Sequence, residues 1–333
     1  MRKIQHAILL LLLLLVITSV ASLMIGTPFI ALKQFAELLL GKGQDLHFLV
    51  VSEFRIPRLL ISLVSGLSLG VSGYLLQGVT RNELADSSLL GINSGAGFFV
   101  MLYLGFYAND ISPFLLLLVA FFGGVSAALL VYTIARKRNG LLGMNRILLA
   151  GIAVNAGLSA LMFLCTIKLS KENYGFVNAW IAGSIWGASW PYVWVLLPWA
   201  AVILVLTVFF SGRIGLLSLG QERARSLGLN VTRSQQILLL VAVALACGSV
   251  AVAGSLSFVG LLAPHAAKLV VRQESQWRFL LSGLFGALFV NSADIIARIV
   301  LPSGEIPTGI LIAVIGAPYF LYLLIFKQKQ IIS

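Results

Sequence analysis

The stretch LLLLVAFFGGVSAALLVY, residues 115–132, decides the class of fold to which this chain belongs. It carries no charged side chain, and the run AILLLLLLLVITSV at 7–20 has the same character. Apolar runs of about 20 residues are long enough to cross a bilayer as helices. Hydrophobic residues make up 59% of the 333 residues and charged residues only 10%, which is more apolar surface than a soluble core can bury. The sequence therefore predicts an all-α polytopic membrane protein.

Apolar runs of this kind recur along the whole chain and predict a single transmembrane domain over 1–333. A short run, VGLLAPHAAKLVV at 259–271, has about 13 residues and cannot cross a bilayer alone. The longer predicted spans lie at 7–27, 56–79, 89–107, 113–135, 145–168, 191–211, 235–254, 277–299 and 308–326.

The Lys and Arg residues decide whether the short run adds a tenth crossing, because cytoplasmic loops carry most of them. With ten crossings and the N-terminus inside, 16 of the 23 basic residues lie on the inner side, whereas nine crossings leave 12 there. We therefore expect ten helices with both termini in the cytoplasm. The stretch GSLSF at 254–258 must then be buried in protein or line a cavity, because non-helical backbone is not tolerated against lipid.

Several other kinds of site find no support in the residues. The net charge of +12 comes from basic residues scattered between apolar runs, which predicts no nucleic-acid partner. Cys165 and Cys247 lie in separate apolar runs, and His265 has no second histidine at ligand spacing. We therefore expect two buried structural thiols, no disulfide and no metal site.

The segment LGQERARSLGLNV at 219–231 is unusually polar for this chain and falls within the inner loop predicted at 212–234. Gln221 to Leu227 can form two helical turns, and Gly228 offers a helix stop. Such a helix could lie on anionic lipid, but it carries Glu222 and few apolar anchors. A docking surface for another protein is the favoured interpretation.

Several motifs resemble the transmembrane permease subunits of the iron-siderophore and cobalamin ABC importers, the class with ten helices per subunit. The resemblance covers nearly the whole chain. It departs from the family at Glu83 and Ser87, where the family usually has Pro, and at Lys268, where it usually has Arg. The motifs are FRIPRLL (54–60), GVSGYLLQGVTRNELADSSLLGINSGAG (70–97), LLAGIA (148–153), WIAGSIWGASW (180–190), LGQERARSLGL (219–229), GSLSFVGLLAPHAAKLV (254–270), ADIIAR (293–298) and GEIPTGILIAVIGAPYF (304–320).

The resemblance implies a function and a set of partners. The chain would be a permease, not an enzyme, in a bacterial cytoplasmic membrane, and would import a ferric siderophore or similar metal chelate, with cobalamin or haem as alternatives. A second permease subunit, two ATPase subunits and an external binding protein would complete the importer. The chain has no G-x-x-x-x-G-K-[ST] loop for ATP, so the partner ATPase would use it and this chain would bind no cofactor. The implied coupling helix to that ATPase comprises Gln221, Glu222, Arg223, Arg225, Leu227 and Gly228.

Three arginines near predicted outer span ends are candidates for docking the binding protein. Arg55 and Arg58 precede or begin the second span, and Arg298 ends the ninth. Guanidinium groups suit bidentate recognition of carboxylates, and the binding proteins of the family present a Glu from each lobe. Asp294 lies inside a span and is a functional candidate, although Arg298 at i+4 offers local pairing.

The second span has one small-residue face formed by Gly66, Gly70 and Gly73 and ending at Gln77. Small residues let helix backbones approach closely in lipid, so this face predicts packing, and Gln77 facing the transport pathway is the alternative. Two other functions fit less well. A secondary transporter needs several intramembrane ionisable groups or duplicated halves, and an intramembrane enzyme needs a nucleophile with a base or a metal motif.

Overall fold

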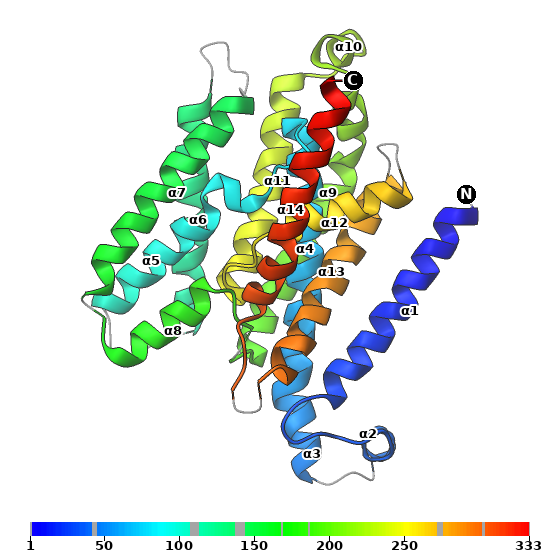
Figure 1. Ribbon diagram of the computed structural model, residues 1–333, viewed down its shortest axis with the longest axis vertical. Coiled ribbons are helices and arrows are strands. Elements are labelled where there is room, and N and C mark those ends of the chain that lie inside the picture. The colour runs from blue at the N-terminus through cyan, green and yellow to red at the C-terminus, as the bar shows by residue number, and fades with distance from the viewer. Residues whose placement is uncertain are drawn as a thin grey trace.

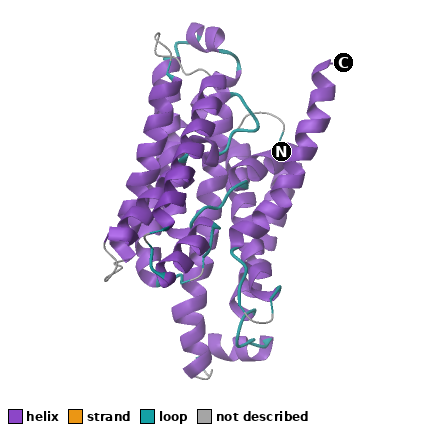
Figure 2. Cartoon of the chain, turned by 60° about the vertical axis from the view of Figure 1, so that its left-hand side comes forward, coloured by secondary structure: helices purple, strands orange, loops and turns teal. Residues whose placement is uncertain are grey.

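The computed structural model describes residues 2–41, 45–106, 113–136, 144–167, 169–185, 187–271, 276–301 and 304–332. Within these ranges the regular structure is helical, and the long helices run roughly side by side (Figures 1 and 2). The helices are α1 (Arg2–Met24), α2 (Leu32–Leu39), α3 (Asp45–Leu49), the π-helical turn η1 (Val50–Arg55), α4 (Ile56–Thr80), the 3-10 turn η2 (Ser87–Leu90), α5 (Ile92–Phe106), α6 (Pro113–Ala135), α7 (Met144–Thr166), α8 (Lys171–Ile181), α9 (Trp190–Ser218), α10 (Gln221–Ser226), α11 (Val231–Ala253), α12 (Val259–Val270), α13 (Gln276–Ile299) and α14 (Thr308–Ile332).

The predicted spans correspond to helices in the described part of the chain. Seven helices there are long and apolar enough to cross a membrane. They comprise α1, the continuous segment from α3 to α4, α6, α7, α9, α11 and α13. Shorter apolar helices lie within α5, α12 and α14, where the remaining crossings are predicted. The prediction of an all-α polytopic membrane protein with about ten spanning helices is confirmed.

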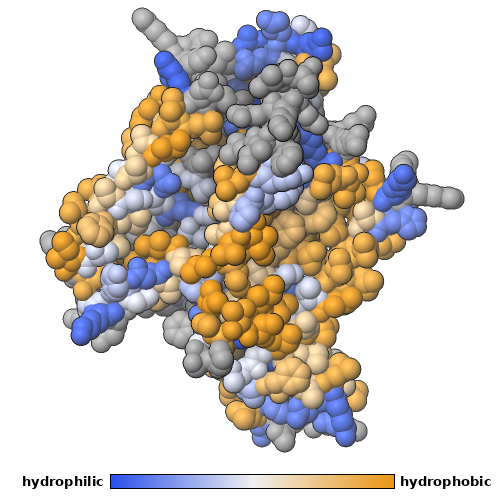
Figure 3. Space-filling model, in the orientation of Figure 1, coloured by the Kyte–Doolittle hydropathy of each residue, from blue (hydrophilic) through white to orange (hydrophobic). Residues whose placement is uncertain are grey.

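The surface supports the same conclusion, because apolar residues gather over the middle of the molecule and polar residues over its ends (Figure 3). One polar end carries α10, and the opposite end carries α2 and α3 (Figures 1 and 3). Both chain termini lie in the half that carries α10 (Figure 1). An even number of crossings requires the two termini to lie on the same side.

The loop predicted at 212–234 is shorter than expected, because α9 continues to Ser218 and α11 already begins at Val231. Ile214 and Leu217 keep the end of α9 helical, since both side chains are buried in the main core. Ile214 packs close to Gly78 of α4. Helix α8 was not predicted, because its eleven residues are too few and too polar to read as a span.

Helix α4 is the central helix and packs against α9, α11, α12 and α13. Its small-residue face makes this close approach possible. A Cβ atom on Gly66 would overlap the backbone of Gly286, one on Gly70 would overlap Ser282, and one on Gly73 would overlap Gly260. The predicted packing of the glycine face is therefore confirmed, and α12 and α13 are the helices that use it.

The non-helical stretch before α12 is held inside the protein, as predicted for GSLSF. The amide of Ser255 donates to the Trp180 carbonyl at 3.2 Å, and Asn93 Nδ2 donates to Ser255 Oγ at 2.8 Å. Asp86 Oδ2 accepts a bond from the Phe258 amide at 3.4 Å. These bonds satisfy backbone and side-chain groups that lipid could not.

Candidate functional site

The short helix α10 stands at one end of the molecule, beyond the ends of the long helices (Figure 1). It begins at Gln221, three positions after α9 ends, and its only buried residue is Ala224, which anchors it to the core. The polar side chains around that anchor therefore remain available on the outside.

The end of α10 is fixed by its sequence. Gly228 has a φ of +84°, the left-handed conformation that glycine adopts without steric cost. The Gly228 amide donates to the Arg225 carbonyl at 2.8 Å, and the Leu229 amide donates to the Ala224 carbonyl at 3.0 Å. These two bonds form a Schellman motif, which confirms the predicted helix stop.

The residues predicted to contact an ATPase lie on the outside of α10. Glu222, Arg223, Arg225 and Gly228 are exposed, while Gln221 is half-buried. Leu227 is 61% exposed although it is a large apolar residue. An exposed leucine among charged groups, on a helix whose position is fixed by its own core anchor, is the arrangement expected of a small docking surface.

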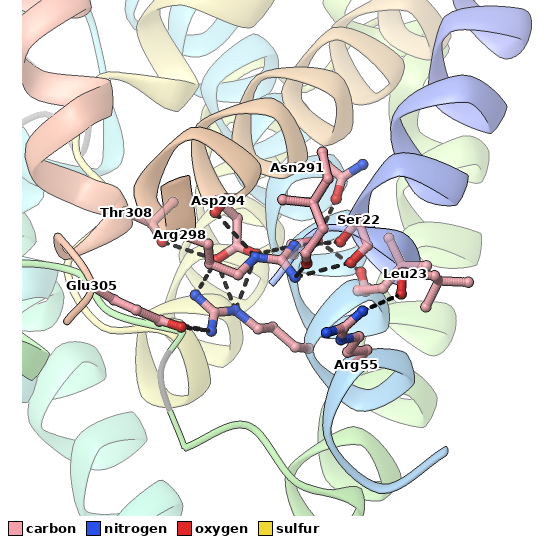
Figure 4. A network of polar contacts seen from close by, with 12 residues as sticks. Ser22, Leu23, Arg55, Asn291, Asp294, Arg298, Glu305 and Thr308 are labelled. Atoms are coloured by element: carbon pink, nitrogen blue, oxygen red, sulfur yellow. Dashed lines mark hydrogen bonds and ion pairs between the residues drawn. The ribbon is translucent and has the colours of Figure 1, made fainter. Parts of the chain in front are cut away.

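The second candidate region lies near the opposite end, where α1, α4 and α13 meet (Figure 4). Arg55 is buried there, and its Nη1 donates to the carbonyls of Leu23 at 2.7 Å and Met24 at 2.9 Å. Its Nη2 donates to the carbonyl of Pro28. The last carbonyls of a helix lack partners within the helix, so Arg55 caps the end of α1.

Arg298 performs a similar task from α13. Its Nη1 donates to the carbonyls of Ser22 at 2.9 Å and Ile25 at 3.1 Å, and its Nη2 donates to the Ser22 hydroxyl at 2.6 Å. Arg55 and Arg298 together tie α1 to the rest of the bundle (Figure 4). Both guanidinium groups therefore have partners within the chain.

Asp294 is fully buried and joins two of the arginines. It accepts two bonds from Arg58, from Nε at 3.0 Å and from Nη2 at 2.9 Å, and forms an ion pair with Arg298 at 3.0 Å. The Thr308 hydroxyl donates a further bond at 3.2 Å. The predicted i, i+4 pairing with Arg298 is confirmed, and Arg58, 236 positions away, is an additional partner.

Glu305 completes this charged cluster, and sequence reasoning missed it. Its carboxylate pairs with Arg58 Nη1 at 2.7 Å and is 30% exposed. Glu305 follows α13 in a segment that carries no apolar pattern, so only its position in the motif GEIPTG could have drawn attention to it. The cluster thus holds three positive and two negative charges.

A cavity of about 450 Å³ adjoins the cluster. Arg55, Arg58, Arg298 and Glu305 all contribute to its lining, together with Gly26 and Thr27. The three predicted docking arginines are therefore brought together around one cavity. Their spacing in the sequence gives no hint that they meet, apart from the short separation of Arg55 and Arg58.

Gln77 is buried at the C-terminal end of the glycine face of α4, and its Nε2 donates to the Gly260 carbonyl at 3.3 Å. This bond links α4 to α12 and supports the packing interpretation of the pattern. Both thiols are free; the expectation of burial holds for Cys247 but is wrong for Cys165, which is only half-buried. The His265 ring packs edge-on against Tyr319 at a centroid distance of 5.5 Å, and no metal cluster occurs among the residues that the structure describes.

Comparison with known proteins agrees with this architecture. The FecCD transport family matches residues 13–326. The iron(3+)-hydroxamate import system permease protein FhuG of Bacillus subtilis is 39% identical over 318 residues, covering 94% of each chain. The hemin transport system permease protein HmuU of Yersinia pestis is 33% identical over 324 residues, covering 96% of this chain and 95% of its own.

A solved structure of a metal-chelate type ABC transporter, in an inward-facing conformation, is similar over the whole fold. Its TM-score is 0.84 at 29% sequence identity, and the alignment covers 96% of this chain and 99% of the other. Together with the match over residues 13–326, this similarity shows that the chain is a transmembrane protein of the FecCD transport family.

Proposed function

We propose that this chain is the permease subunit of an ATP-driven importer that carries a ferric siderophore or a similar metal chelate across a bacterial cytoplasmic membrane. The observation that carries the proposal is helix α10, which is anchored at one end of a membrane-spanning bundle and exposes its charged side chains. The choice of cargo rests on the relatives, because FhuG is named for iron(3+)-hydroxamate import. Haem is the second candidate cargo, favoured by the similarity to HmuU.

In this proposal α10 seats in a groove of a separate ATPase subunit. Its exposed charges, Glu222, Arg223 and Arg225, would fix the register of the contact, and Leu227 would supply the apolar anchor. The α10 end then faces the cytoplasm, together with both termini (Figure 1). ATP is bound by the partner, since this sequence has no phosphate-binding loop.

Two such permease subunits, identical or similar, would enclose the transport pathway, and two ATPase subunits would drive it. Movement of α10 reaches the bundle through α9, which it follows after only two residues. Helix α9 packs against α4, whose glycine face holds α12 and α13. These packed helices can rock as rigid units, which is the motion that alternating access requires.

The arginine cavity at the opposite end would receive the external binding protein. Carboxylates of that protein would enter the cavity lined by Arg55, Arg58 and Arg298. Arg58 is the most adaptable of the three, because one of its partners is the partly exposed Glu305. Exchange of Glu305 for an incoming carboxylate would keep the charge on Arg58 compensated throughout docking.

The test measures uptake of a radiolabelled ferric hydroxamate in cells that carry the complete importer. Collapse of the proton gradient with ATP kept high should leave uptake intact, whereas depletion of ATP should stop it. The double variant Glu222→Ala and Arg225→Ala should lose uptake while still inserting into the membrane. The matched control is Arg233→Ala, which removes an exposed base just beyond α10. Uptake that follows the proton gradient instead of ATP would contradict the proposal.

A further inference from the structure

A second polar cleft, of about 270 Å³, lies near the α10 end and has no part in the function proposed above. Its walls come from the ends of α4 and α9 and from parts of α12 and α13. The charged side chains in its lining are Arg81, Glu83, Lys268 and Arg278. The lining therefore carries three positive charges and one negative charge.

The positive groups are held in place by neighbouring elements. Arg81 follows the last residue of α4, and its Nη2 donates to the Leu217 carbonyl of α9 at 2.6 Å. Arg278 is only 5% exposed, and its guanidinium carbon lies 5.9 Å from the centre of the Tyr74 ring. Lys268 of α12 pairs with Glu83 and remains about one third exposed.

The position of the cleft fits the headgroup layer of a bilayer. Trp277, next to Arg278 in sequence, is 43% exposed, and tryptophans of this kind mark the boundary between lipid tails and water. Phe209 of α9 lies nine residues before Ser218, which lines the cleft, and is a large exposed apolar residue. This part of α9 therefore faces lipid tails, on the bilayer side of the cleft. Basic pockets between transmembrane helices at this level bind the phosphate-bearing headgroups of anionic lipids.

We propose that the cleft binds a phosphate group, as carried by an anionic phospholipid of the leaflet on the α10 side. A guanidinium fork at Arg278 and an ammonium group at Lys268 are both suited to phosphate oxygens. The bound lipid would join α12 and α13 to the end of α9, immediately before α10. Free inorganic phosphate offers the same chemistry, and the experiment separates the two sources.

The experiment follows thermal unfolding of the purified full-length chain in a neutral detergent. Phosphatidylglycerol, phosphatidylcholine and inorganic phosphate are titrated separately into the wild type and into Lys268→Gln, Arg278→Gln and Arg233→Gln. We expect phosphatidylglycerol, but not phosphatidylcholine, to raise the unfolding midpoint of the wild type. Lys268→Gln should weaken the apparent affinity about fivefold, the effect of one basic residue near a membrane surface.

Arg233→Gln is the matched control, because it removes an exposed base from the same end of the molecule but outside the cleft. Its titration should equal that of the wild type. Protection by inorganic phosphate that is equally weakened in Lys268→Gln would identify a free anion as the ligand of the same site. Titrations that are identical in Lys268→Gln and Arg233→Gln would overturn the proposal, as would equal protection by phosphatidylcholine. Lys268 is partly exposed, so this variant remains informative if Arg278→Gln does not fold.

Discussion

Asp294 and Glu305 bind the same arginine but should contribute very differently to stability. Asp294 is fully buried and is shared between Arg58 and Arg298, whereas Glu305 is 30% exposed and pairs with Arg58 alone. The substitutions Asp294→Asn and Glu305→Gln each remove one negative charge and keep the shape of the side chain. The pair therefore compares a buried carboxylate that two arginines share with a partly exposed carboxylate that pairs with one arginine.

The expected magnitudes follow from these environments. Removal of one partner from a buried ion pair costs about 3–5 kcal/mol, because the remaining charge stays buried without compensation. Asp294→Asn leaves Arg298 with carbonyl and hydroxyl partners only, and leaves Arg58 with Glu305. An exposed pair contributes about 0.2–1 kcal/mol, which is the expected loss for Glu305→Gln.

The assay is reversible unfolding of the purified chain, in which a denaturing detergent is titrated into neutral micelles and helix content gives the free energy of unfolding. The double variant Asp294→Asn and Arg298→Gln should lose less than the sum of the two single variants, because the uncompensated cation has been removed. Equal losses below about 1 kcal/mol for Asp294→Asn and Glu305→Gln would refute the reasoning. The cluster would then be a solvated surface network and not a buried one.

Three further predictions can be tested on this protein, the second with a pair of matched variants. Leu227→Ala should weaken association of the chain with its ATPase subunit by about 1–2 kcal/mol, measured by co-purification or by binding in detergent, since an exposed anchor is lost without a change in the fold. Gly73→Ala should lower the free energy of unfolding by about 1–3 kcal/mol through overlap with α12. Gly212→Ala, in an open helical position, should raise it by about 0.5–1 kcal/mol, and a loss at both sites would contradict the packing argument. Ten crossings predict Gln276 on the cytoplasmic side and Ser303 on the outer side, although Ser303 lies outside the described residues. Gln276→Cys, in a background without Cys165 and Cys247, should react with an impermeant thiol reagent only from the cytoplasmic side, and labelling from outside intact cells would exclude ten crossings.

Local sequence determined the long apolar helices of this protein and the polar helix α10 between two of them. Long uncharged runs have to cross the bilayer as helices, because every backbone group in lipid needs a partner within its own segment. The distribution of basic residues predicts ten crossings, and the run at 259–271, predicted as a helix too short to cross alone, forms the twelve-residue helix α12. Gly228 ended α10 where its sequence predicted, because a glycine stop depends only on neighbouring residues.

The tertiary structure decided which residues meet. The glycine face of α4 signalled close packing, but only the folded chain shows that α12 and α13 occupy it. Arg58 and Asp294 are 236 positions apart, and Arg298 reaches Ser22 across 276. Pairings at such separations depend on how the helices pack against one another in the fold, and hydropathy carries no information about neighbours in lipid, where every face is apolar. The sequence could therefore single out three arginines near predicted span ends, while the fold alone determined that they surround one cavity and that two of them also hold the end of α1.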